Sequence, residues 1–391
     1  AGVAGLSAAC SLKKMGIPLS SIVILEASNH VGGRLKATTP HTILSSNGKP
    51  SSVHHDFKCV WVPFLAGVTK SPGHSFFKSP LGKSLSASPE SSESSSEPLS
   101  HKSNELKIRI YAMLSDNEEN FNYFLDSIGK PIKTEKLNIR SFKFYSDGAL
   151  GSRGACLIKP YSDIKDSTYG MLLSDIEHFK KSAERLYKHG FQMCTHSIGD
   201  SAARTILNIY GNILKGVNDK RWRLEHAQVI NENDFEMFGK YSIIPSIQPT
   251  HATSDMLWAI LRLGKNRIRN GYAYKTLLEQ NGMVALGTDF PIEGINPIHT
   301  FFAAVARKNL NGEPKNGFQK ENSLTRIEAL KGMTIWAAIA NFEEKDKGSL
   351  EKGKYADFTI LSNNLLEIPE DEILSTKVIS TYLNGELVYG N

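Results

Sequence analysis

The sequence is poor in cysteine and has no long apolar run. Its 391 residues include only 4 cysteines, which lie far apart and form no Cys-x-x-Cys pair. This usage fits reduced thiols in the cytosol better than a disulfide framework. The best apolar run, residues 60–68, is far shorter than the roughly 20 residues that span a bilayer and contains Pro63. We therefore expect a soluble, cytoplasmic protein that does not insert into a membrane.

The sequence also has no strong excess of one charge. It does not begin with an initiator methionine. The 46 basic and 40 acidic residues give a net charge of +6 without a dense Lys/Arg block. A solvated surface explains this balance better than nucleic-acid binding does. The chain begins at Ala1, as a fragment of a longer protein would. With 40% hydrophobic and 22% charged residues, the composition excludes collagen-like, coiled-coil and wholly disordered chains.

A serine-rich stretch divides the chain into two segments of different character. Between residues 84 and 103 roughly half of the residues are serine and almost none is apolar. We predict a disordered linker there. The preceding stretch, residues 36–83, carries no pattern that assigns it to a known element.

After the linker, strand-like and helix-like patterns alternate. Runs rich in Ile, Val, Phe and Tyr predict strands over residues 106–114, 139–146, 191–196, 221–228, 243–248 and 283–289. Capping boxes predict two helix starts: Ser174 with Glu177, in a helix that ends at Gly190, and Thr325 with Glu328, in a helix through Trp336. This order predicts βαβ units and a parallel sheet or barrel over residues 104–345.

The last part of the chain has a different pattern. Strand-like runs over residues 355–361 and 376–389, the second interrupted by the turn pair Asn384-Gly385, predict a hairpin. We expect residues 346–391 to form a small β element beside the barrel.

Four polar residues lie in or at the ends of predicted strands: Lys143, His196, His226 and Asp289. Barrel enzymes hold their sites at the carboxyl ends of the strands. Two neutral imidazoles and a carboxylate suit Zn²⁺, whereas a lysine binds a metal only after losing its proton or becoming a carbamate. A single histidine at a strand end is more often structural. The residues by themselves leave the metal site and the structural role equally open.

Six motifs, in this order, resemble the metal-dependent amidohydrolase superfamily, and in particular the branch that includes N-substituted formamide deformylase. The resemblance runs from about residue 104 to the C-terminus. The motifs are KFYSDGALGSRGA (143–155), THSIGDSAA (195–203), RLEHAQ (223–228), SIQPTHATSDM (246–256), LGTDFPIE (286–293) and GSLEKGKYADF (348–358).

The resemblance implies a (β/α)₈ barrel of the TIM type with a small β-sandwich. It implies hydrolysis of a carbon–nitrogen bond other than a peptide bond, in a small amide-type substrate, with zinc or another divalent metal. His196 and His226 would bind metal, Asp289 would bind metal and act as the general base, and Lys143 would bridge two metals if carboxylated. Arg153 and His251 would contact substrate, although a role as ordinary loop residues is equally open.

The chain departs from this family in its first strands. Members carry a His-x-His pair at the end of the first barrel strand, and no His-x-His occurs in this sequence. His54-His55 is a poor substitute because adjacent side chains on a strand face opposite sides. Six of eight barrel strands are recognisable, so we expect an incomplete α/β barrel with two open edges and a metal half-site. A catalytically inactive remnant is therefore an alternative.

The opening residues have a mechanism of their own. Gly2 and Gly5 allow a tight turn and a close approach to a pyrophosphate, and Glu26, at the end of a short strand, would receive ribose hydroxyls. With Gly33 and Arg34, this opening resembles the FAD-binding N-terminus of flavin-containing amine oxidases.

The resemblance covers only residues 1–35 and lacks the first strand of the dinucleotide fold. We interpret these residues as a partial Rossmann-like fragment, too small to retain FAD by itself. An FAD-dependent amine oxidase is thus the second alternative. The joining of the two segments is explained either by a gene fusion or by an error in gene prediction.

Overall fold

The computed structural model describes residues 22–26, 43–44 and 50–51 by their backbone, and residues 106, 108–165 and 167–390 with their side chains. The predictions for Gly2, Gly5, Gly33 and Arg34, and the prediction of a disordered linker over residues 84–103, lie outside the described residues.

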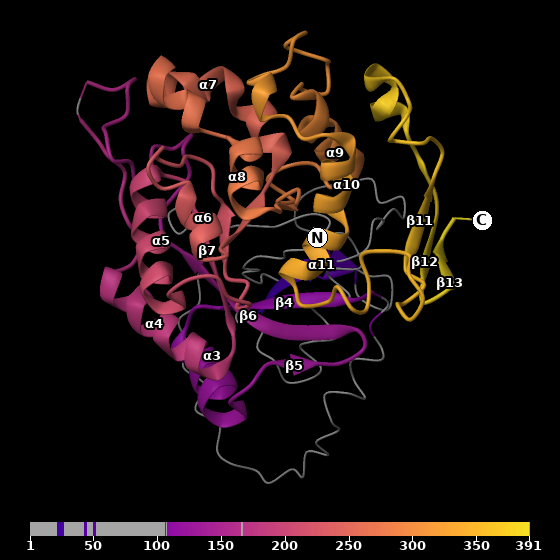
Figure 1. The fold of residues 1–391 in the computed structure, drawn as a ribbon, viewed down its shortest axis with the longest axis horizontal. Helices are drawn as coiled ribbons and strands as arrows, with labels where there is room; N and C mark the ends of the chain where they lie inside the picture. Colours follow the sequence, from indigo (N-terminus) through magenta and orange to yellow (C-terminus); the bar gives the residue numbers. More distant parts are fainter. Residues whose placement is uncertain are drawn as a thin grey trace.

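A curved sheet forms the centre of the molecule (Figure 1). Its strands run in the order β1-β4-β6-β7-β8-β9-β10, with β5 beside β6. Along the path β4-β6-β7-β8-β9-β10 every neighbouring pair is parallel, which makes a parallel half-barrel, whereas the short β5 pairs with β6 antiparallel. The bounds are β1 Ile22–Glu26, β4 Ile110–Ser115, β5 Ile132–Lys133, β6 Leu137–Tyr145, β7 Gln192–Ser197, β8 Arg223–His226, β9 Ile244–Ile247 and β10 Ala285–Leu286. All six predicted barrel strands are confirmed.

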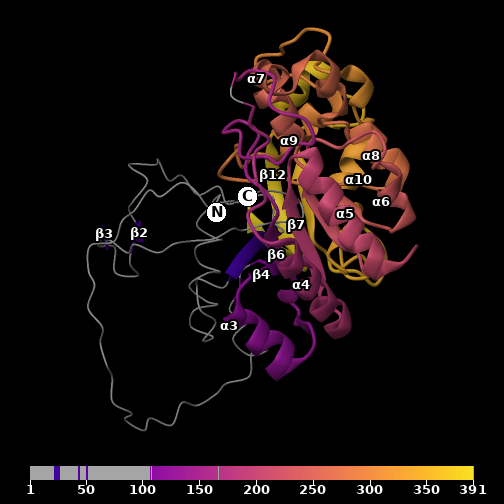
Figure 2. The same ribbon diagram turned by 90° about the vertical axis from the view of Figure 1, so that its left-hand side faces the viewer.

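Helices cover one face of this sheet, as Figure 2 shows for α4, α5, α6, α8 and α10. Of these, α4, α5 and α6 are each the first helix after a strand, as expected of βαβ units, whereas α8 and α10 follow another helix. The helices are α3 Glu118–Asn120, α4 Ile176–His189, α5 Asp200–Leu214, α6 Glu236–Lys240, α7 Pro249–Arg267, α8 Tyr274–Asn281, α9 Pro297–Ala306, α10 Arg326–Met333 and α11 Ile335–Ala340. Short 3₁₀ turns occupy Ile268–Asn270, Lys320–Asn322 and Glu370–Ser375, and α3 continues into a π-helix, Phe121–Ile128.

In strand β6, alternate residues point to the two faces of the sheet. Phe142 stacks on Phe121 with ring centroids 5.0 Å apart and meets Phe191 edge-on, so its face packs under the helices. Lys143, one residue along, is buried on the opposite face, because side chains alternate along a strand.

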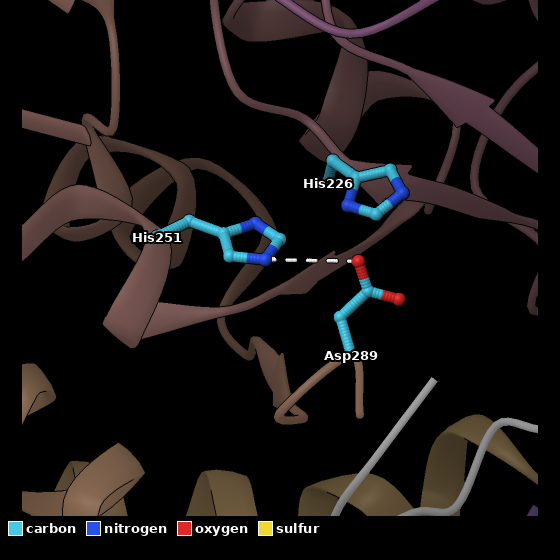
Figure 3. A group of neighbouring side chains, drawn as sticks. All are labelled: His226, His251 and Asp289. Atoms are coloured by element: carbon cyan, nitrogen blue, oxygen red, sulfur yellow. Dashed lines mark ion pairs between the residues drawn. The ribbon is translucent and has the colours of Figure 1, made fainter. Parts of the chain in front are cut away.

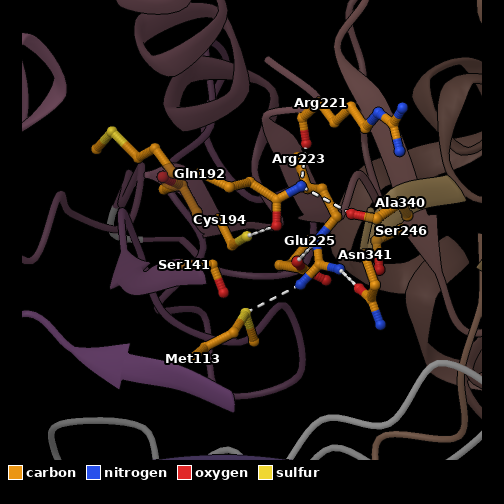
Figure 4. A network of polar contacts seen from close by, with 12 residues as sticks. Met113, Ser141, Gln192, Cys194, Arg221, Arg223, Glu225, Ser246, Ala340 and Asn341 are labelled. Carbon is orange, nitrogen blue, oxygen red and sulfur yellow. Dashed lines mark hydrogen bonds and ion pairs between the residues drawn. The ribbon is translucent and has the colours of Figure 1, made fainter. Parts of the chain in front are cut away.

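That opposite face carries a buried polar network (Figure 4). Arg223 donates from Nε to Glu225 Oε1 at 2.8 Å and from Nη1 to Asn341 Oδ1 at 2.7 Å. Gln192 donates to the carbonyl oxygen of Ala340 at 2.8 Å and accepts from Cys194 Sγ at 3.1 Å. The interior of the half-barrel is therefore held by hydrogen bonds as well as by apolar contacts.

Two of the predicted helix signals differ from the structure. The Ser174–Glu177 capping box is wrong: α4 begins after Asp175, and no side chain caps it. Gly190 ends this helix with φ 73°, as predicted. The Thr325–Glu328 box is confirmed by both of its hydrogen bonds, but the helix it begins breaks at Thr334.

The C-terminal residues form a three-stranded antiparallel sheet of β11 Phe358–Leu361, β12 Val378–Leu383 and β13 Glu386–Tyr389. Asn384 and Gly385, with φ 53° and 81°, make the predicted hairpin turn between β12 and β13. Asp357 accepts from Arg109 Nε at 2.7 Å, which ties this small sheet to the residue before β4.

One predicted edge is not open. Strand β1 ends at Glu26, as predicted, but pairs antiparallel with β4 and covers the edge of the half-barrel there. The expectation of an unpaired edge at β4 is therefore wrong, because backbone hydrogen bonds from the first segment satisfy it. No described strand pairs with the far edge of β10.

The unassigned stretch contains a two-stranded ribbon of β2 Ile43–Leu44 and β3 Pro50–Ser51. Within the residues that the structure describes, no helix combines the length and apolar character needed to cross a bilayer.

Candidate metal centre

Three side chains converge at the carboxyl ends of neighbouring strands (Figure 3). His226 ends β8, His251 lies in the first turn of α7 directly after β9, and Asp289 follows β10. Their donor atoms all lie within 4.8 Å of one another. The distance from His251 Nε2 to Asp289 Oδ2 is 3.6 Å. All three side chains are buried, so the cluster sits inside the protein and not on its surface.

The backbone turns sharply at two of these residues. His226 has φ 71° and Asp289 has φ 58°, both in the left-handed region that side-chain-bearing residues seldom adopt. Such conformations cost about 1–3 kcal/mol each and persist where the surrounding structure enforces them, often at functional sites. Here they occur where the chain leaves a strand and presents its side chain to the cluster.

His196 and Lys143 border the cluster. The His196 ring meets the His226 ring edge-on, with centroids 4.5 Å apart. Lys143, on β6, lies beside the same group: its Nζ is 5.2 Å from the centroid of the Tyr145 ring, which is itself 5.5 Å from the His196 ring. The four residues predicted as metal ligands are thus neighbours, and His251 joins them.

The polar atoms of this group lack hydrogen-bond partners within the described part of the chain. They are Lys143 Nζ, both ring nitrogens of His196, His226 Nε2, His251 Nε2 and Asp289 Oδ1. Leaving one buried polar atom unsatisfied costs about 1–3 kcal/mol, so a concentration of them in one place requires an explanation. A divalent cation would satisfy several at once, and the residues present therefore fit a metal.

The histidines are held in the form that binds metals. Burial lowers the pKa of His251 to about 4. Burial, followed by the charges of neighbouring groups, lowers the pKa of His196 and His226 well below the usual value. Neutral imidazole at pH 7 offers a lone pair. Burial also raises the pKa of Asp289, and the Lys143 charge opposes that shift.

A neighbouring side chain fixes which nitrogen of His226 faces the cluster. His226 Nδ1 lies 2.8 Å from Gln248 Oε1, and an amide oxygen only accepts, so Nδ1 carries the proton and Nε2 is free. Sequence reasoning missed Gln248. Its position at the end of β9, in the motif SIQPTH, is the signal that could have identified it.

The two residues predicted as substrate contacts have different surroundings. His251 lies inside the cluster, where it adds a donor that does not depend on a His-x-His pair. Arg153 lies in the loop after β6 and forms two hydrogen bonds with Asp163, at 3.2 and 3.0 Å. Arg262 pairs with the same carboxylate. In this structure Arg153 therefore pairs within its own loop, which Asp163 connects to α7, and Arg153 is not part of the cluster.

Comparison with known proteins gives two family matches. The profile of the amidohydrolase family matches residues 91–389, and that of an NAD(P)-binding Rossmann-like domain matches residues 1–59.

Curated relatives match the later segment. Protein LONG AFTER FAR-RED 3 of Arabidopsis thaliana is 33% identical over 261 residues, 66% of this chain and 44% of that protein. Putative amidohydrolase YtcJ of Bacillus subtilis is 33% identical over 249 residues, 64% of this chain and 47% of that protein. N-substituted formamide deformylase of Arthrobacter pascens is 26% identical over 209 residues, 53% of this chain and 38% of that protein. The chain spans less than half the length of these relatives.

Two solved structures share the fold. An uncharacterized metal-dependent hydrolase from Pyrococcus horikoshii superposes with a TM-score of 0.60 at 30% identity, over 68% of this chain and 53% of that chain. Its counterpart from Pyrococcus furiosus gives 0.59 at 28% identity, over 68% and 52%.

Proposed function

This chain belongs to the amidohydrolase family, and from that premise we propose that it is a metal-dependent hydrolase. We further propose that it cleaves carbon–nitrogen bonds other than peptide bonds, in a small amide-type substrate. The observation that carries the proposal is the buried group of His226, His251 and Asp289, whose donor atoms converge while several remain without partners.

We propose that these three residues and His196 bind metal, and that Lys143 would bridge two metals if carboxylated. Two neutral imidazoles and a carboxylate suit Zn²⁺, and a site with three protein ligands leaves a position open for water or substrate. A bound divalent cation supplies two effects: it lowers the pKa of water from 15.7 to about 7, and it polarises a substrate carbonyl.

Asp289 is the proposed general base. Its Oδ2 faces His251, while Oδ1 has no hydrogen-bond partner in the described part of the chain and can take a proton from the attacking water. The carboxylic acid so formed can then pass that proton to the leaving amine. Burial raises the pKa of Asp289 well above its usual value, and the charge of Lys143 opposes this shift only in part; a bound divalent cation would further favour the ionised, proton-accepting form.

The first segment favours the second candidate, an FAD-dependent amine oxidase. Its match to a Rossmann-like domain over residues 1–59 supports a dinucleotide-binding origin. Contacts of FAD with Gly2, Gly5, Glu26, Gly33 and Arg34 stay predictions, as does the cytoplasmic location. The amidohydrolase match covers five times as many residues, so the hydrolase is the proposal that we place first.

The test measures metal content and hydrolysis together. We expect the purified chain to contain about one equivalent or more of zinc and to hydrolyse an acylated amine, with activity lost on chelation and in His226→Ala. His178→Ala is the matched control, because His178 pairs with Asp116 at 2.7 Å outside the cluster. Protein that binds no added zinc and hydrolyses no acylated amine would contradict the proposal. A flavin absorption band would instead favour the oxidase.

A further inference from the structure

Asp147 is a buried carboxylate just beyond the end of β6, and only 1% of it is exposed. Its two oxygens accept three backbone hydrogen bonds: Oδ1 from Ile198 N at 3.0 Å, and Oδ2 from Gly199 N and Cys156 N, each at 2.8 Å. Among the described residues, no lysine or arginine forms an ion pair with it. The titratable side chain that it does approach is His196, whose Nε2 lies 3.6 Å from Oδ1.

These hydrogen bonds join two loops at the edge where the cluster lies. Cys156 belongs to the loop after β6, while Ile198 and Gly199 form the turn between β7 and α5. The two loops pack closely, since a Cβ added at Gly199 would lie 2.1 Å from the carbonyl oxygen of Cys156. Asp147 therefore sits at a junction that tolerates little displacement.

The same segment holds His196 from a second side. Ser146 donates to the His196 carbonyl oxygen from its backbone N–H at 3.0 Å and from Oγ at 2.6 Å. The backbone of His196 is thereby fixed against the residue before Asp147. What remains to be set is which nitrogen of the imidazole ring turns toward His226; a backbone hydrogen bond with Gly148, the residue after Asp147, also reaches the ring and opposes the lowering of the His196 pKa by burial.

We propose that Asp147 is a positioning residue for the candidate metal centre: its carboxylate orients the His196 ring through Nε2 and leaves Nδ1 for a divalent cation. This inference rests on the proposed function. A metal-binding histidine usually directs its other ring N–H to a carboxylate or carbonyl, which fixes both the tautomer and the ring. Gln248 already serves His226 in this way. At 3.6 Å the Asp147–His196 contact is electrostatic and longer than a hydrogen bond.

The test compares Asp147→Asn with Asp200→Asn. Asp200 is a matched control because it is also buried, and its Oδ1 accepts from Ile158 N at 2.8 Å, in the same loop as Cys156. It forms no ion pair with a histidine among the described residues. The readouts are the Zn²⁺ dissociation constant, from competition with a chelator, and the visible absorption spectrum of the Co²⁺-substituted protein.

We expect Asp147→Asn to weaken Zn²⁺ binding by about 10- to 100-fold and to change the Co²⁺ spectrum. Asp200→Asn should leave both unchanged, even if it loosens the loop. A double-mutant cycle then separates the two routes of action. If Asp147 acts through His196, Asp147→Asn adds little in a His196→Ala background; a full additive effect there would overturn the inference.

A measurement on the wild-type protein keeps the inference testable if the Asn variant fails to fold. Long-range ¹H–¹⁵N spectra of the zinc-loaded chain report which ring nitrogen of His196 carries the proton. Protonated Nε2 is the expected result, and protonated Nδ1 overturns the inference. A wild-type chain that binds neither Zn²⁺ nor Co²⁺ would instead defeat the proposed function. Binding with the wild-type constant and spectrum in Asp147→Asn would defeat only the role of Asp147.

Discussion

His251 Nε2 lies 3.6 Å from Asp289 Oδ2, across the gap between the first turn of α7 and the loop after β10. The two residues are 38 positions apart in the sequence and come from different strand–helix connections. The sequence suggests His251 as a substrate contact. Because of this short distance, His251 is instead a candidate metal ligand.

Replacing His251 distinguishes these two roles. If His251 binds the metal, His251→Ala should lose more affinity than the roughly 10- to 100-fold that loss of a supporting residue costs, and zinc content should fall. If it contacts only substrate, the variant should keep its zinc and show a raised KM. Elemental analysis and steady-state kinetics on the same preparation decide between them. Retained zinc with a raised KM would show that His251 contacts substrate and does not bind the metal.

The buried Arg223–Glu225 pair predicts a stability change. Both side chains are fully buried, and the Arg223 guanidinium also reaches Asn341 (Figure 4). Arg223→Met leaves the Glu225 carboxylate without its cation, and we expect a loss of about 3–5 kcal/mol in the free energy of unfolding.

The double variant Arg223→Met with Glu225→Met removes both charges and should recover part of that loss. Urea unfolding at constant pH measures the three free energies. A single variant as stable as the wild type would show that the pair does not hold the interior of the half-barrel.

Asp255 predicts a pH dependence of stability. Its Oδ2 accepts from Tyr272 Oη at 2.8 Å, and burial raises its pKa from 3.8 to about 7. Between these two values the folded chain binds more protons at this group than the unfolded chain does. This contribution to stability is therefore complete below the unfolded pKa and is lost as the pH rises through 7, by at most about 1.4 kcal/mol per pH unit.

Asp255→Asn removes the titration while keeping an oxygen that can accept from Tyr272. We expect its stability to decline less than that of the wild type between pH 4.5 and 7.5. The difference between the two proteins measures the contribution of Asp255 separately from that of other buried carboxyl groups. Parallel slopes in denaturant unfolding would contradict the assignment.

The helix starts offer a paired comparison. Thr325 accepts from Glu328 N at 3.2 Å and caps α10, whereas Ser174 caps nothing. Thr325→Ala should cost about 1 kcal/mol, and Ser174→Ala should cost almost nothing. Thermal unfolding of the two variants measures this difference in stability. Equal losses in the two variants would mean that Thr325 does not stabilise the protein by capping α10.

The sequence by itself determined where the strands of the half-barrel lie in the chain and two members of the cluster. All six barrel strands follow from local apolar runs, and His226 and Asp289 could be chosen because parallel strands bring their carboxyl ends to one edge. The capping residue Thr325 and the hairpin turn Asn384-Gly385 could also be predicted from the sequence, because each depends on residues at most three apart.

Only the tertiary structure decided which loop residues meet. The sequence allows His251 to be an ordinary loop residue, but in the folded chain it lies next to Asp289. Arg153 contacts Asp163 and lies outside the cluster. The role of Asp147 depends on backbone N–H groups up to 52 residues away, which carry no sequence signal. Strand β1 pairs antiparallel on β4 because an open edge accepts any strand whose backbone can reach it. Local propensity reports on neighbours in the chain, whereas a site is made by contacts between residues that are distant in it.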